Sequence, residues 1–127
     1  VQPFDRRGDE VVVYGLGNFL SNQSANCCIA STQDGMIAML RIEEQPAGGF
    51  LVAESTYVAT WVDRSDYTII PVNETLAAGA TLDGSPISAD LRSVLQTSRG
   101  RTQSAVTALG ADGWGARPAD NTWSLPD

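Results

Sequence analysis

Hydrophobic and polar residues alternate along two long stretches of the chain, Met36–Glu43 and Phe50–Trp61, and this period of two is typical of β-strands. The segment between them, Glu44–Gly49, contains a proline and paired glycines, which is typical of a hairpin connection. Tyr67–Val72 is a third extended segment. Pro71 restricts it to a sheet edge or ends it, because proline cannot donate to a β-ladder. The pattern predicts an antiparallel meander of three strands.

A fourth strand is expected at Val11–Tyr14, where an unbroken apolar run is typical of a strand buried on both faces. The preceding residues 3–10 are rich in turn-forming side chains, so we expect a turn there. The polar stretch Ser24–Asp34 and the segment 73–84 are expected to be loops.

Two glycines follow this strand, and the chain then becomes rich in neutral hydrogen-bonding side chains. Gly15 and Gly17 lack a Cβ, so they suit either a simple bend or bulge or a close approach to another group. Binding sites in sheet proteins tend to lie just past strand ends. The candidate substrate-binding residues are therefore Asn18, Ser21 and Asn22.

Apolar residues recur at helical spacing over Ile87–Leu109, which predicts a helix near the C-terminus. Ser85 and Pro86 are typical of a helix N-cap and first helical position, and Gly110 is a natural stop. Gly100 interrupts the pattern at a cost of about 1 kcal/mol relative to alanine, so the helix is either long or kinked. We expect its apolar stripe to pack on the sheet, the alternative being a partner-binding face.

The last segment, residues 111–127, contains glycines, prolines and two tryptophans and predicts no regular element. Trp114 and Trp123 are expected to pack it against the body, the alternative being an aromatic platform for a sugar. Together these features predict an α+β fold, mostly an antiparallel sheet of about four strands with one long or kinked C-terminal helix. Its parts are a β-rich region, 1–84, the helix, 85–110, and the tail, 111–127.

Composition narrows the possible functions. A chain of 127 residues that is 43% hydrophobic fits one domain with a core. With 8 basic and 15 acidic residues the net charge is −7, which opposes nucleic-acid binding. No apolar run approaches the length of a membrane span. Histidine is absent, so no imidazole of this chain can act as a base or metal ligand, and a serine triad is excluded.

The cysteines and aspartates do not define a reactive centre. Cys27 and Cys28 are adjacent, and we expect two free thiols with at least one buried, because a disulfide between neighbours is strained. The alternatives are that strained disulfide or a metal site, for which further ligands are missing. The aspartates lie among predicted turns and are expected to be solvated, so no acid–base pair is assigned. They are Asp5, Asp9, Asp34, Asp63 and Asp66. No catalytic residue and no metal ligand is predicted in this chain.

The sequence resembles the CapA family of bacterial capsule (poly-γ-glutamate) synthesis proteins at two places near its start, Val1–Pro3 and Val13–Phe19. Members of that family carry a string like HPHVVQP, then a short strand and YSLGNF. Here Gly15 stands where the family has serine, a conservative change in a tight bend. The later run Leu91–Leu109 is similar to the C-terminal helix of the family.

The resemblance implies a calcineurin-like metallophosphoesterase fold, an α/β sandwich whose His, Asp and Asn ligands hold a pair of metal ions. The Gly-His-x-His segment of the family would lie immediately before Val1, so this chain would be the C-terminal third, inactive alone. No cofactor is then expected in this chain, and divalent metal ions are expected in the intact protein. Asn18 would face the cavity and bind a substrate oxygen, the alternative being that it caps the turn through local backbone bonds.

The function implied by the resemblance is synthesis of capsule, poly-γ-glutamate or another cell-envelope polymer, on the extracellular face of the bacterial membrane or after secretion. The implied partners are the missing N-terminal part and the polymer or its precursor. Self-association is also expected, because loss of that part would expose the apolar strand Val11–Tyr14. The alternative function is a non-enzymatic extracellular β-rich module that binds a polymer or protein partner through the Cys27–Asp34 loop and Trp114.

Overall fold

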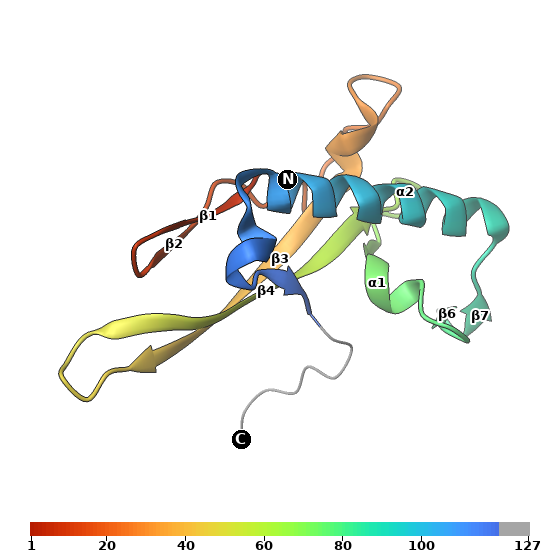
Figure 1. The fold of residues 1–127 in the computed structure, drawn as a ribbon. Coiled ribbons are helices and arrows are strands. Elements are labelled where there is room, and N and C mark those ends of the chain that lie inside the picture. Colours follow the sequence, from red (N-terminus) through yellow and green to blue (C-terminus); the bar gives the residue numbers. More distant parts are fainter. Residues whose placement is uncertain (120–127) are drawn as a thin grey trace.

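The computed structural model describes residues 1–119, and within them the main sheet has four strands built around one long hairpin. β3 (Asp34–Glu44) and β4 (Phe50–Val62) pair antiparallel along their lengths. β5 (Ile69–Pro71) pairs antiparallel with the end of β4, and β8 (Arg117–Pro118) pairs with β4 in parallel. The predicted meander of three antiparallel strands is confirmed, and Pro71 lies at the end of its strand. Figure 1 shows the tip of the β3–β4 hairpin extending well beyond the rest of the sheet.

A separate hairpin precedes this sheet, and here two predictions are wrong. Residues 3–10, expected to be a turn, contain β1 (Phe4–Arg7), which pairs antiparallel with β2 (Glu10–Val13). The predicted strand Val11–Tyr14 is not buried on both faces, since its valines are half-buried and Tyr14 is 43% exposed. The reason is that β2 belongs to a two-stranded hairpin, in which one face remains open to water.

The segment after β2 joins this hairpin to the main sheet. Gly17 forms an isolated antiparallel bridge with Gly35, at the start of β3. The backbone N–H of Asn18 donates to the carbonyl oxygen of Asp34 at 3.0 Å, and that of Met36 donates to Leu16 at 2.8 Å. The residues that follow the predicted strand end therefore lie along the edge of β3.

The long C-terminal helix is confirmed, with a different start. α2 (Ala89–Val106) begins after Ser88, whose hydroxyl oxygen accepts from the backbone N–H of Leu91 at 3.1 Å. A 3-10 turn, Thr107–Leu109, extends it to Gly110, which ends it with a positive φ of 75° as predicted. The helix runs without interruption past Gly100, so it is long and continuous.

The segment between β5 and α2 is more regular than the loop expected over 73–84. α1 (Val72–Thr75) follows β5 directly. β6 (Thr81–Leu82) then pairs antiparallel with β7 (Ser85–Pro86). The assignment of Ser85 and Pro86 to the start of the helix is therefore wrong, because both lie in a small hairpin that precedes the helix.

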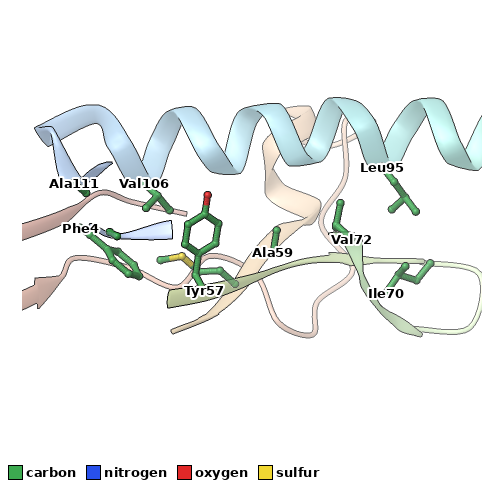
Figure 2. Close-up of a cluster of buried hydrophobic side chains, with 10 residues drawn as sticks. Phe4, Tyr57, Ala59, Ile70, Val72, Leu95, Val106 and Ala111 are labelled. Carbon is green, nitrogen blue, oxygen red and sulfur yellow. The ribbon is translucent and has the colours of Figure 1, made fainter. Parts of the chain in front are cut away.

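One hydrophobic core fills the space between α2 and the sheet (Figure 2). Leu95 and Val106 contribute from α2 and are fully buried, which confirms that the helical stripe packs on the sheet. The rings of Phe4 and Tyr57 meet edge to face with centroids 6.1 Å apart. The buried cluster consists of Phe4, Met36, Tyr57, Ala59, Ile70, Val72, Leu95, Val106, Ala111 and Ala116.

The described part of the tail is folded back on the body. Ala111–Trp114 forms a 3-10 turn, and β8 follows, so the prediction of no regular element is wrong for these residues. Trp114 packs against the core, and the guanidinium of Arg6 lies 5.9 Å from the centre of its ring. Trp123 lies outside the described residues. The α+β class predicted from the sequence is confirmed.

Candidate functional site

The three candidate residues Asn18, Ser21 and Asn22 follow the strand end, beside an open cleft of ≈ 700 Å³. The cleft lies where the N-terminal residues, the segment after β2 and the start of β3 meet. Asn18 and Ser21 line it, and Asn22 does not. The lining residues are Val1, Gln2, Gly15, Leu16, Gly17, Asn18, Ser21, Gln23, Ser31, Thr32 and Asp34.

Asn18 holds the two sides of the loop together. Its side-chain Nδ2 donates to the hydroxyl oxygen of Ser21 at 2.9 Å and to the backbone carbonyl of Thr32 at 2.6 Å. The alternative that Asn18 caps the turn through local backbone bonds is not what the described residues form, because its backbone partner Thr32 is 14 positions away and its local partner is the Ser21 side chain. Within residues 1–119 no group donates to its Oδ1, so this oxygen remains able to accept a hydrogen bond in the cleft.

Asn22 is turned toward a different part of the molecule. Its Oδ1 accepts from Nε of Arg64 at 3.2 Å and from Nη2 of the same residue at 3.0 Å. Arg64 lies in the turn between β4 and β5, so this contact fastens the loop to the sheet. The structure thus brings Asn18 and Ser21 together and separates Asn22 from them.

Asp34 lines the cleft, and the sequence did not reveal this position. The expectation of a solvated carboxylate is wrong, because Asp34 is 2% exposed and accepts from the Ser98 hydroxyl at 2.7 Å. Arg101 adds two bonds, from Nε at 2.6 Å and from Nη2 at 2.7 Å. The hydrogen bond to Asp34 raises the pKa of Arg101 above its ordinary value. The pair ties the floor of the cleft to α2.

Two glycines permit the close approach that shapes this region. A Cβ on Gly35 would lie 2.2 Å from the carbonyl oxygen of Asn18. A Cβ on Gly17, whose φ is 77°, would lie 2.6 Å from the carbonyl oxygen of Asp34 and 2.8 Å from the backbone nitrogen of Val1. Gly17 therefore serves as a close-approach residue, and Val1 is packed against it.

The other aspartates do not gather into a site. Asp63 and Asp66 each accept a backbone N–H two residues ahead, in the local turns that were predicted. Asp5 lies in β1 instead of a turn and accepts from the Tyr14 hydroxyl at 3.1 Å. The hydrogen bond from Arg7 lowers the pKa of Asp5 below its ordinary value. None of these carboxylates lines the cleft.

The adjacent thiols are free, and the expectation that at least one is buried is wrong, since Cys27 and Cys28 are both exposed. Their sulfur atoms lie 2.8 Å apart. The hydrogen bond between them lowers the pKa of the Cys27 thiol, and the same pairing raises the pKa of the Cys28 thiol. The backbone carbonyl of Ser24 accepts from the Cys27 thiol at 3.4 Å.

The two thiols are expected to react at different rates. Because the thiolate is the nucleophile and Cys27 has the lowered pKa, iodoacetamide near neutral pH should alkylate Cys27 several-fold faster than Cys28. Fragment-ion mass spectrometry after a short exposure measures the ratio. The variant Cys28→Ala lacks the hydrogen bond that lowers the pKa of Cys27, so alkylation of Cys27 should be slower in it than in the unchanged protein. Equal rates in the unchanged protein would contradict the predicted asymmetry.

The described residues of the cleft offer recognition by amide and hydroxyl groups, with no nucleophile paired to a base. Within residues 1–119, no three His, Cys, Asp or Glu side chains converge so that they could hold a metal ion. Over the same part of the chain, no helix has both the length and the apolar character needed to cross a membrane. Comparison with protein-family models, curated proteins and solved structures found no match to this chain.

Proposed function

We propose that this chain is the C-terminal portion of a CapA-type, metallophosphoesterase-like protein that acts in the synthesis of capsule, poly-γ-glutamate or another cell-envelope polymer. The observation that supports it is the placement of the two segments that resemble that family. The backbone N–H of Gln2 donates to Gly15 at 2.9 Å, and that of Tyr14 donates to Pro3 at 3.2 Å. Val1–Pro3 and Val13–Phe19 are thus adjacent segments at the edge of the cleft.

In this proposal the reactive centre is contributed by residues upstream of Val1. Val1 lines the cleft together with Asn18 and Ser21, so a chain preceding Val1 would continue from the same edge. The proposal assigns the metal ligands to that upstream part, as the resemblance to the family implies. Divalent ions bound there would supply metal-assisted hydrolysis.

The cleft residues of this chain have the role of holding the substrate. The Ser21 hydroxyl accepts from Asn18, which leaves its own hydrogen free to donate to a substrate oxygen. The Oδ1 of Asn18 is free to accept from a substrate hydroxyl or amide. Asn22, bonded to Arg64, stabilises the loop that carries them.

Several exposed apolar side chains in the segment after β2 support a further covering part. Leu16, Phe19, Leu20 and Ile29 are each at least half exposed and lie in one loop region. We propose that the N-terminal part of the same protein covers them, and that the chain without that part self-associates through this surface, not through the half-buried strand β2. The proposed partners are the envelope polymer or its precursor outside the membrane. Nucleic acid is not proposed as a partner, because the net charge of −7 opposes its binding.

The gene should be required for the polymer in the bacterium that carries it. Deletion should remove most of the cell-bound polymer, and the unchanged gene should restore it. The variant Asn18→Ala should restore about five- to thirtyfold less polymer, because a substrate acceptor worth ~1–2 kcal/mol is lost. A polymer assay on washed cells measures this.

Asn26→Ala is the matched control, because Asn26 lies exposed in the same loop and its side chain is in no described hydrogen bond. It should restore the polymer fully. Melting of the purified variants distinguishes a folding defect from lost binding, since Asn18 also bonds Thr32. An unchanged polymer after deletion would overturn the proposal in favour of the binding module.

A further inference from the structure

A second cavity, of ≈ 300 Å³, lies on the other flank of α2 from the Asp34 contact. Arg99 and Gln103 are four residues apart and so share one side of the helix, whereas Arg101 reaches the opposite side. No residue lines both this cavity and the cleft described above. It is lined by Tyr57, Ala59, Asn73, Arg99, Gln103 and Pro118.

Asn73, one of the residues that line the cavity, carries an acceptor that has no partner among the described residues. The Oδ1 of Asn73 is buried and receives no hydrogen bond from residues 1–119. Leaving such an oxygen unpaired costs free energy, so a bound molecule that carries an N–H or O–H donor would be stabilised there.

Neutral donors lie on the same cavity wall. Tyr57 is 2% exposed, and Figure 2 shows its hydroxyl directed toward α2. Burial raises the pKa of Tyr57, so the hydroxyl stays protonated and can donate. The Tyr57 hydroxyl forms no hydrogen bond with the described part of the chain. Gln103 adds an amide from the helix.

One positive charge completes the set. Arg7, Arg41, Arg101 and Arg117 each form an ion pair, whereas Arg99 forms none within the described residues. A guanidinium recognises carboxylate and phosphate groups through paired N–H donors. A single arginine in a chain of net charge −7 matches the single charge of a carboxylate better than the double charge of a phosphate.

We propose that this cavity binds a small carboxylate that also carries a hydrogen-bond donor. Arg99 takes the carboxylate, with the Tyr57 hydroxyl and the Gln103 amide beside it, and the Oδ1 of Asn73 accepts from the donor. The volume lies at the small end of ligand sites, which fits a molecule of amino-acid size. The site is independent of the proposed role of the cleft.

The test is a ligand-observed NMR titration of the protein at its natural length with N-acetylglycine, which has both groups. Two analogues each lack one of these groups. In 4-oxopentanoate a CH₂ group stands in place of the N–H donor, and in N-acetylglycinamide an uncharged amide stands in place of the carboxylate. N-acetylglycine should bind saturably and at least about tenfold more tightly than either analogue.

Variants locate the binding. Arg99→Gln should weaken the binding of N-acetylglycine by about tenfold or more, because a charged hydrogen bond is lost. Asn73→Ala should abolish the preference over 4-oxopentanoate, and removing an unpaired acceptor should not harm folding. Arg92→Gln is the matched control, since Arg92 lies on the same helix outside the cavity, and it should bind normally.

Two results would overturn the proposal. One is the lack of saturable binding of N-acetylglycine, in which case a water molecule donates the hydrogen bond to the Oδ1 of Asn73. The other is equal weakening by Arg99→Gln and Arg92→Gln, which would show a general charge effect.

Discussion

Replacing Asp34 by alanine is expected to lower the free energy of unfolding by about 3 kcal/mol. The carboxylate is buried and receives three bonds, one from Ser98 and two from Arg101. Its removal leaves the Ser98 hydroxyl buried without its acceptor and the guanidinium without its counter-charge. Since Arg101 is 31% exposed, water compensates part of the loss, so the low end of the usual range applies. Urea unfolding measures the change.

Glu54→Ala is the matched control for that experiment. Glu54 also contacts two arginines, Arg41 and Arg117, but this group is on the surface. Its loss should cost less than about 1 kcal/mol, and added salt should reduce that cost further because it screens surface charges. If Asp34→Ala were as mild as Glu54→Ala, the bond between the cleft floor and α2 would not be a main support of the fold.

Replacing Gly35 by alanine is expected to lower the free energy of unfolding by about 3 kcal/mol. The new methyl group would lie 2.2 Å from the Asn18 carbonyl oxygen and 2.7 Å from the Thr60 hydroxyl oxygen. The first of these atoms belongs to the backbone, so relief requires the segment at Gly17 to move away from β3. Thermal unfolding measures the loss. Hydrogen exchange at the Asn18 amide, which donates to Asp34, should become faster.

Gly100→Ala is the matched control, because the Cβ position there has nothing within 4 Å. Gly100 lies in the middle of α2, so alanine should raise stability by about 1 kcal/mol through its better helix propensity. The two substitutions add the same methyl group, and their expected effects on the free energy of unfolding are opposite in sign. Destabilisation of similar size at both positions would contradict the close approach at Gly35.

The long hairpin could be predicted from the sequence because its signals are local. The alternation within β3 and β4 and the glycine-rich connection between them need no knowledge of distant residues. The same holds for the end of α2 at Gly110. The bond from Asp34 to Arg101 could not be predicted in this way, because the two residues are 67 positions apart.

Two elements were missed for identifiable reasons. β1 carries charged side chains on its open face, so Phe4–Arg7 does not have the apolar pattern of a strand. The β6–β7 hairpin turns at Asp83 and Gly84, which both have positive φ, and an Asp-Gly pair is a strong hairpin signal. The cap-like Ser85 and Pro86 beside this signal favour a helix start at their own position, whereas the helix begins after Ser88.

The candidate site was partly predictable. Asn18 and Ser21 were found because they follow a strand end marked by glycines, and both line the cleft. The direction of Asn22 depends on Arg64, which comes from a turn far along the chain, so local sequence could not reveal it. The cavity at Arg99 combines residues from β4, α1, α2 and β8 and has no local signal.

The coding sequence immediately upstream of Val1 tests the central claim most directly, because the proposal assigns the metal ligands to that region. We predict a Gly-His-x-His segment directly before Val1, which would enter the cleft beside Gly17 and Asn18, and Asp and Asn ligand motifs further upstream. An upstream sequence without these histidines and acidic or amide ligands would contradict the account.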